Sequence, residues 1–355
     1  MNIDIHIHMI GNGRDIDNID NDVYFYTDDN NHWFTRLLYN LIEDDLQRLE
    51  ADLNRDGRVS THEYIELIYR MLKESEEIDA IVLLALDGLY SPKTGLLDKE
   101  RTDLLVSNRF LYRLTLQLNK RLMDEGSKKR FLFGASVSPN RRDWESELEY
   151  VLTQTDAVLV KLIPSTQHIH LMDSRHRDFY NTLSRYNIPL LCHVGPEYSF
   201  PEGIRNKRLD NFRLLERPLE CGVRVIAAHC ATPVFPFIDK DETREFYHLM
   251  KQTNIDGSVR LLADTSALSI STRSHLIPLI LDLFPQEWLL HGSDFPIPID
   301  GWTQLPYLNH GVNVDEYIGI VRTKNPLDRD VRIKRAHGFS DLILSNAERV
   351  LRLKV

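Results

Sequence analysis

Eight short runs rich in Val, Ile and Leu alternate with longer segments of helical periodicity along this chain. Such alternation is typical of strand–helix units whose strands form a parallel sheet. Eight units are the number that closes a (β/α)8 barrel, so we expect an α/β fold of the TIM-barrel type. The predicted strands are residues 2–8, 78–86, 131–137, 157–163, 188–193, 223–228, 259–264 and 288–292.

The chain has 355 residues, more than the core of such a barrel, which usually has about 250. The excess lies mainly between residues 8 and 78, a gap far longer than most of the later ones. We therefore expect a single domain over 1–355 with a helical insertion at 34–74, after the first strand. The apolar spacing over 340–353 predicts an amphipathic helix that closes the barrel.

Composition excludes several classes of protein. The net charge of −10 gives no basic surface for nucleic acid or an anionic membrane. The longest apolar stretch, 80–86, is too short to cross a bilayer. Three cysteines cannot form a disulfide framework, and the first residues lack the pattern of a secretory signal. We expect a cytoplasmic protein that acts on a small molecule, with no nucleic-acid or membrane partner; the sequence leaves its oligomeric state open.

Histidine and aspartate stand at the ends of predicted strands, where a barrel of this type places its active site. His6 and His8 share one face of the first strand because residues two apart point the same way. His193, His229 and Asp294 follow the fifth, sixth and eighth strands. Any one of them alone would more often be a hydrogen-bonded packing residue. Together they supply the nitrogen and oxygen donors that suit zinc or a similar divalent ion, and they predict a catalytic metal site.

The chain resembles the amidohydrolase superfamily in its His6-x-His8 motif, in His193 and His229, and in the GSDFP segment around Asp294. Two further segments, VKLIP and PLLCHVGPE, resemble the amidohydrolase-related branch that also contains aminocarboxymuconate semialdehyde decarboxylase. The resemblance implies one or two divalent ions, with zinc as the expected metal, held by His6, His8, His193 and Asp294. His229 would either complete a second metal position or activate the bound water.

Lys161, near the end of the fourth predicted strand, has two possible roles under this resemblance. In two-metal members of the superfamily a lysine at this place is carboxylated and bridges the ions. In the one-metal, decarboxylase-like members the position is not a ligand, and an ordinary lysine here would lie in the pocket wall and pair with a substrate carboxylate. Both roles remain open at this point.

The implied chemistry is attack by water on a carbonyl group. A divalent ion lowers the pKa of bound water to about 7 and polarises the carbonyl. Asp294 could take a proton from the water and return it to the leaving group, and His229 could donate to the developing oxyanion. The leading hypothesis is a metal-dependent hydrolase that cleaves an amide, lactone or related carbonyl bond. The alternative is a non-oxidative decarboxylase of a small carboxylic acid, and a remote third is a non-catalytic, calcium-organised binding protein.

Further polar residues follow predicted strands and are candidates for substrate contact. Arg14 and Arg141 follow the first and third strands and could meet an anionic substrate, although an arginine in such a place is more often a solvated loop residue. Glu197 follows the fifth strand and is a further candidate for substrate contact. Glu197 and Asp264 could also orient the histidines by contacting the ring nitrogens that do not bind the metal.

The segment 52–63, DLNRDGRVSTHE, fits the twelve-residue EF-hand loop. Oxygen-bearing side chains stand at positions 1, 3, 5, 9 and 12, and Gly57 stands at position 6, where the loop turns sharply. Apolar stripes on both sides predict flanking helices. Because EF-hands usually occur in pairs, we expect calcium to have a structural role over the barrel mouth; a polar turn without metal is the alternative. The expected ligands are Asp52, Asn54, Asp56, Arg58 through its backbone, Ser60 and Glu63.

Overall fold

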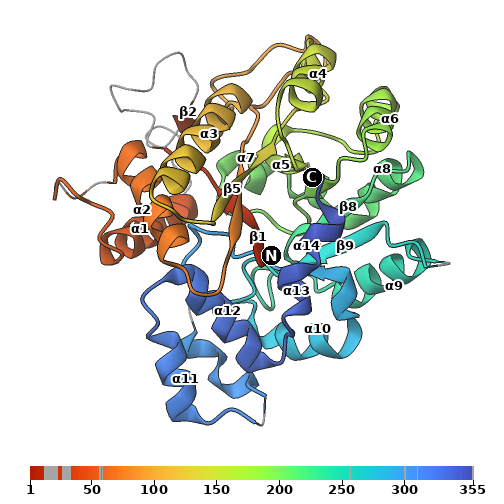
Figure 1. Ribbon diagram of the computed structural model, residues 1–355. Helices are drawn as coiled ribbons and strands as arrows, with labels where there is room; N and C mark the ends of the chain where they lie inside the picture. Colours follow the sequence, from red (N-terminus) through yellow and green to blue (C-terminus); the bar gives the residue numbers. More distant parts are fainter. Residues whose placement is uncertain are drawn as a thin grey trace.

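Eight parallel strands form one sheet that closes into a barrel (Figure 1). The computed structural model describes residues 1–11, 23–25, 33–55, 57, 59–255, 257–299, 301–309 and 311–353, with the backbone only for 23–25 and 33–36. The strands are β1 (Ile3–His8), β3 (Ala80–Leu84), β5 (Arg130–Ala135), β6 (Leu159–Leu162), β7 (Leu190–Cys192), β8 (Val225–Ala227), β9 (Leu261–Asp264) and β10 (Leu289–Leu290). Each matches one of the eight predicted runs within a few residues, and the expected TIM-barrel fold is confirmed.

Backbone hydrogen bonds between the first strand and the end of the last one close the barrel. The amide of Ile5 donates to the carbonyl of His291 (3.0 Å), and the amide of His8 donates to the carbonyl of Phe295 (2.9 Å). In the other direction, the amide of Asp294 donates to the carbonyl of His6 (2.9 Å). Closure of the barrel therefore brings His6, His8 and Asp294 together from opposite ends of the chain.

Helices surround the strands and bury their outer faces (Figure 1). Strands such as β3, β6 and β9 are buried throughout, which explains why the predicted runs are almost continuously apolar instead of alternating with polar residues. The helices on the outside of the barrel are α3 (Asn108–Asp124), α4 (Trp144–Gln154), α6 (Arg177–Arg185), α8 (Glu216–Glu220), α9 (Thr243–Thr253), α10 (Ile277–Leu283) and α12 (Pro326–His337). Further helices are α5 (Pro164–Gln167), α7 (Pro201–Arg205) and α11 (Val314–Val321).

Local signals in the sequence determine where several of these helices begin and end. The side chain of Ser107 accepts a hydrogen bond from the amide of Phe110 at the start of α3. Helix α12 begins with Pro326 and ends before Gly338, whose φ of 114° is a conformation that favours glycine. Among the helices of the described residues, none combines the length and apolar character needed to cross a membrane.

Two helices follow β1 and lie against the carboxyl ends of the strands: α1 (Trp33–Arg48) and α2 (Thr61–Glu74). The hydroxyl of Tyr64 donates to the carbonyl of His8 (2.7 Å), and its ring stacks on Phe295 with centroids 6.0 Å apart. From α1, the hydroxyl of Tyr39 donates to the carbonyl of Ser199 in the segment after β7 (2.9 Å). The helix pair is therefore attached to both sides of the barrel mouth.

A second, two-stranded sheet was not expected from the sequence. Strand β2 (Val23–Phe25) pairs antiparallel with β4 (Leu104–Val106). Val106 also exchanges backbone hydrogen bonds with Leu86, at 2.8 and 3.2 Å, just beyond the end of β3. Strands of three residues are too short to show a period of two, so their pairing depends on neighbours that only the fold supplies.

The expectation of one continuous helix over 340–353 is wrong. The segment instead forms α13 (Leu342–Ser345) and α14 (Ala347–Val350), which meet at Asn346. The side-chain amide of Asn346 donates to the carbonyls of Gln286 and Leu289, at 2.9 and 2.8 Å. These bonds hold the chain to the segment around β10 at the point where the helix is interrupted.

Candidate metal centre

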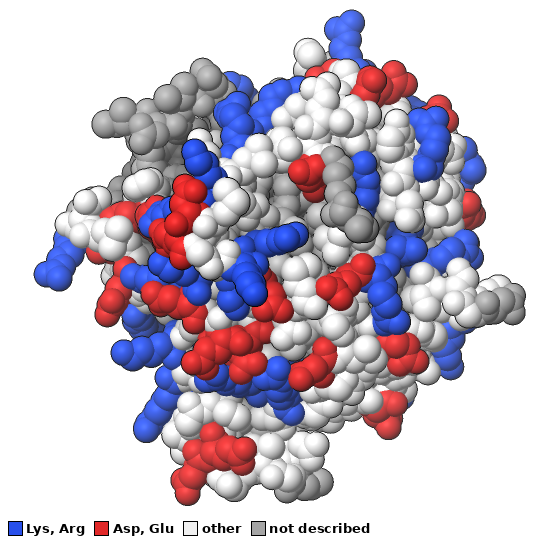
Figure 2. Space-filling model, viewed as in Figure 1, with Lys and Arg blue, Asp and Glu red and all other residues white. Residues whose placement is uncertain are grey.

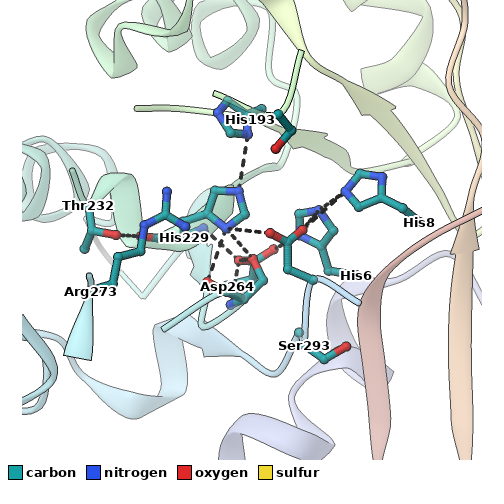
Figure 3. Close-up of polar contacts among 12 residues, drawn as sticks. His6, His8, His193, His229, Thr232, Asp264, Arg273 and Ser293 are labelled. Carbon is teal, nitrogen blue, oxygen red and sulfur yellow. Dashed lines mark hydrogen bonds and ion pairs between the residues drawn. The ribbon is translucent and has the colours of Figure 1, made fainter. Parts of the chain in front are cut away.

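Three predicted side chains meet at the carboxyl ends of β1 and β10. The Nε2 atoms of His6 and His8 lie 3.2 Å apart, and each lies 3.2 Å from Oδ1 of Asp294. Figure 3 shows the two imidazoles pointing toward one another from β1. Within the part of the chain that the structure describes, this is the one group of three or more His, Cys, Asp or Glu side chains close enough to share a metal ion.

Asp264, at the end of β9, fixes the orientation of His6. Its Oδ2 lies 2.7 Å from Nδ1 of His6, and both side chains are fully buried. Burial raises the pKa of Asp264, but His6, His229 and Ser266 lower it by more, so the net pKa lies below the usual range and the group is a carboxylate. A carboxylate accepts the proton of Nδ1, which leaves the lone pair of Nε2 directed at His8 and Asp294.

His229 connects the group to the side of the barrel formed by β7 and β8. Its ring lies between those of His6 and His193, with centroid distances of 5.3 and 5.0 Å (Figure 3). Its Nε2 is 3.2 Å from Nδ1 of His193, and its Nδ1 is 2.8 Å from the hydroxyl of Ser266. Burial lowers the pKa of His229 to about 3, so the ring is neutral at pH 7.

His193 lies next to the three-residue group but is not part of it. Its buried Nε2 has no hydrogen-bond partner among the described residues, and the nearest carboxylate, that of Glu197, is 3.5 Å away. Glu197 accepts a hydrogen bond from the amide of Ser199, which fixes its position at the start of the segment after β7. The structure thus places Glu197 beside a predicted metal ligand, and both line the same cavity.

Lys161, on β6, reaches the same centre from the opposite wall of the barrel. Its side chain is fully buried, and Nζ lies 2.9 Å from Nε2 of His6. Burial lowers the pKa of this ammonium group, although Asp264 and Asp294 act in the opposite direction. The lysine therefore contacts the His6 atom that faces the centre.

Unusual backbone conformations occur at the same strand ends. Asp294 has a φ of 68°, and His229, Cys230 and Ala231 have φ values of 58°, 52° and 54°. Left-handed non-glycine residues cost of order 1–3 kcal/mol each and are found mainly where function requires them. Gly292 is needed for a different reason, because a Cβ there would lie 2.8 Å from Cβ of His6. At Gly292 the backbone therefore packs directly against the side chain of His6.

A cavity of about 1140 Å³ opens onto these side chains. At its inner end it is lined by His8, His193, His229 and Asp294. Its outer wall is formed by α1, where Leu37 and Leu41 remain about half exposed. The exposure of these leucines on a predicted apolar stripe is explained by the cavity that they face. A small molecule can therefore reach the centre beneath the helical insertion.

The structure places the two predicted arginines differently. Arg141 forms ion pairs with Asp87 (3.3 Å) and Asp143 (2.9 Å), and it is not among the residues that line the cavity. Arg14 lies outside the described residues. A third arginine, Arg273, was not singled out from the sequence. It is 3% exposed and lines the cavity, in the segment after β9. Its position after the end of a predicted strand could have made Arg273 a candidate. However, the sequence does not show which loop arginine points into the cavity.

The described residues of the predicted calcium loop surround a tight turn between α1 and α2. The amide of Gly57 donates to Oδ2 of Asp52 (2.9 Å). The carboxylate of Glu63 accepts from the amides of Asn54 and Ser60, both at 2.9 Å, and from the Ser60 hydroxyl at 2.8 Å. Ser60 and Glu63 form a capping box at the start of α2. Two further predicted ligands, Asp56 and Arg58, lie outside the described residues.

Figure 2 shows acidic and basic side chains intermixed over the face that it presents, without an extended area of one sign. The surface shown there gives no further candidate site.

No protein family model and no curated protein sequence matches the chain. An uncharacterised TIM-barrel protein, Bb4693 from Bordetella bronchiseptica, is 13% identical, with 98% of this chain and 99% of that chain covered and a TM-score of 0.53. The 4-oxalomesaconate hydratase LigJ from Rhodopseudomonas palustris is 16% identical, with coverages of 99% and 95% and a TM-score of 0.51. The 5-carboxyvanillate decarboxylase LigW from Sphingomonas paucimobilis is 13% identical, with coverages of 99% and 99% and a TM-score of 0.46. The first two matches establish a shared barrel fold over nearly the whole chain.

Proposed function

We propose that this protein is a metal-dependent hydrolase of the amidohydrolase superfamily that acts on a small molecule. The observation that carries the proposal is the convergence of His6 Nε2, His8 Nε2 and Asp294 Oδ1 at mutual distances of 3.2 Å. It lies at the end of the barrel where enzymes of this fold have their active sites. The likeness to a hydratase of the same fold is consistent with catalysis here.

The donor set fits a divalent metal ion. Two imidazole nitrogens and a carboxylate oxygen that face one point suit zinc, and a carboxylate behind a ligating histidine, as Asp264 stands behind His6, is the usual supporting contact. We include His193 as a further ligand because its buried Nε2 lacks a hydrogen-bond partner. When bound, such an ion polarises a carbonyl group and lowers the pKa of water.

Asp294 is proposed to move the proton. Burial raises its pKa, but His229, His6 and His8 lower it by more, so the pKa lies well below the usual range and the group is an anion. An anionic carboxylate at this place can accept a proton from water and later return it to the leaving group. Its position beside both histidines of β1 suits it to that role.

His229 is proposed to accept a hydrogen bond from the attacking water, whose proton passes to Asp294. The hydroxyl of Ser266 donates to Oδ1 of Asp264, so the proton on Nδ1 of His229 is directed at the Ser266 hydroxyl and carbonyl oxygens. That tautomer leaves Nε2 of His229 without a proton. This arrangement favours the role in which His229 assists the attacking water over the one in which it donates to the oxyanion.

Lys161 keeps two proposed roles. Nζ is 2.9 Å from Nε2 of His6, which is compatible with a carboxylated lysine that bridges two ions and with an amine that contacts substrate. Metal analysis separates them: two ions per chain, with loss of both metal and activity in Lys161→Ala, would support bridging. One ion per chain, unaffected by bicarbonate, would support the amine.

Labelled water tests hydrolysis against decarboxylation. The metal-loaded protein is incubated in H₂¹⁸O with panels of lactones, amides and small carboxylic acids. A hydrolase incorporates solvent oxygen into its product, whereas the alternative decarboxylase releases carbon dioxide without doing so. Tight binding of metal with no turnover of either panel would favour the non-catalytic binding protein and count against both enzymatic assignments.

We also propose that calcium binds the loop at 52–63 and stabilises the insertion. The capping box of Ser60 and Glu63 and the bond from Gly57 to Asp52 give the described part of the loop a compact turn. Calcium titration by calorimetry should show a site in the wild type that Glu63→Gln loses. The absence of calcium binding in the wild type would favour the alternative of a polar turn.

A further inference from the structure

We infer that Arg273 is a substrate-recognition residue that binds a carboxylate group of the substrate, at a point in the cavity separate from the metal ligands. The inference rests on the proposed function because it concerns the substrate of that same site. The inference narrows the proposed substrates to small molecules with a carboxylate attached to an apolar group.

Arg273 is a buried cation, 3% exposed, for which the described residues provide no ion pair. Asp294, Glu197, Asp264 and Asp239 raise its pKa from a distance, but burial lowers the pKa by more. Its Nε donates to the carbonyl of Pro233 at 3.3 Å, which anchors the side chain but leaves the terminal nitrogens of the guanidinium for other acceptors. Buried charges in proteins are normally paired.

Lys334 shows how a buried structural cation is paired in this protein. It contacts Asp330 at 2.6 Å and the carbonyl of Gly292 at 2.7 Å. Arg273 differs from Lys334 because no carboxylate of the described residues lies within ion-pair distance of its guanidinium group, and burial is not fully offset by the carboxylates further away.

The position of Arg273 suits contact with a molecule in the cavity. It lines the cavity together with His193, His229 and Asp294, and Figure 3 shows it approaching from beside His229 and Thr232. Its positive charge contributes to lowering the pKa of both His193 and His229, as expected for a cation close to both rings. A ligand held by Arg273 would lie beside His229.

The walls around Arg273 define the rest of the ligand. The segments after β8, β9 and β10 contribute the apolar lining residues Val234, Phe235, Ile270 and Ile297, with Ser271 and Thr272 beside them. A guanidinium group offers a planar pair of donors that matches the two oxygens of a carboxylate. The combination of one unpaired arginine with apolar walls suits a carboxylate attached to an aromatic or aliphatic group.

Binding of benzoate, compared with the neutral analogue benzamide, tests the inference. Calorimetry on metal-free and zinc-loaded protein should show that the wild type binds benzoate more tightly than benzamide in both forms. Arg273→Met should weaken benzoate binding by about tenfold or more, as expected for loss of a charged hydrogen bond, and leave benzamide binding unchanged. The affinity of Arg273→Lys for benzoate should lie between the affinities of the wild type and of Arg273→Met. The matched control is Arg175→Met, since Arg175 is exposed, pairs with Asp173 and is not a lining residue.

Equal binding of benzoate and benzamide by the wild type would overturn the inference, as would full benzoate binding by a folded Arg273→Met. If Arg273→Met does not fold by circular dichroism, Arg273→Lys decides, because wild-type affinity for benzoate in that variant would also overturn it. Failure of the proposed function would look different. In that case zinc would not bind, while the metal-free protein would still show benzoate binding that depends on Arg273.

Discussion

At the scale of single residues, the candidate centre depends on which nitrogen of His6 carries a proton. Asp264 decides this by accepting from Nδ1 at 2.7 Å, and its other oxygen accepts from the amides of His229 (2.8 Å) and Ser266 (3.1 Å). One buried carboxylate thereby connects β1 to the ends of β8 and β9. Removal of this carboxylate should weaken metal binding more than it lowers the stability of the fold.

Asp264→Asn should weaken zinc binding by about 10–100-fold, the usual effect of losing a carboxylate behind a ligating histidine. The amide retains an oxygen for the backbone donors but is no longer an anion that holds the Nδ1 proton. Competition with a chelator measures the affinity. Asp173→Asn, which alters an exposed ion pair with Arg175, is the control and should bind zinc like the wild type. Unchanged affinity in Asp264→Asn would contradict the role given to this residue.

Asp294→Asn should lower kcat by about 10²–10⁴-fold on any substrate that the wild type turns over, because the amide cannot accept a proton. Steady-state kinetics at matched metal content separates this effect from loss of metal. Full activity in a metal-loaded Asp294→Asn protein would show that another group moves the proton.

At the scale of elements, the helix pair after β1 both encloses the cavity and holds a strand end. Tyr64 of α2 donates to the carbonyl of His8 at 2.7 Å and is 1% exposed. Tyr39 of α1 reaches the segment after β7. The insertion therefore supports the backbone that carries His8, in addition to forming the outer wall of the cavity.

Tyr64→Phe should lower the free energy of unfolding by about 1–3 kcal/mol, since it leaves the carbonyl of His8 without this buried donor. Urea denaturation followed by circular dichroism measures the change. Tyr186, which is 37% exposed on the outside of the barrel, supplies the control, and Tyr186→Phe should leave the midpoint unchanged. Equal stability of Tyr64→Phe and the wild type would mean that the insertion does not support β1 through this bond.

At the scale of the whole molecule, three of the proposed metal ligands lie on the two sides of the seam that closes the barrel. His6 and His8 belong to β1, and Asp294 follows β10, the last strand. An ion that binds all three would connect the first and last strands of the sheet. Metal binding should therefore stabilise the folded barrel as a unit.

Chelation of the metal should lower Tm, and zinc should restore it. Binding at a concentration of 100 times Kd stabilises a folded protein by about 2.7 kcal/mol. Differential scanning calorimetry with and without zinc measures the shift, and a His8→Asn variant should show a much smaller one. A zinc-dependent Tm that persists undiminished in His8→Asn would place the stabilising ion elsewhere.

The sequence by itself determined the eight strands and the positions of His6, His8 and Asp294, because apolar periodicity and the residues at strand ends are local properties. Only the tertiary structure decided which polar residues complete the centre. The bond between His6 and Asp264 joins residues 258 positions apart. Arg273 lines the cavity whereas Arg141 pairs with Asp87 away from it, a difference that no local sequence pattern shows. The break in the helix at Asn346 and the pairing of β2 with β4 also depend on contacts between segments that are far apart in the sequence. Packing against distant segments sets the loop conformations and the long-range side-chain contacts. The periodicity of a short stretch of sequence carries no information about that packing.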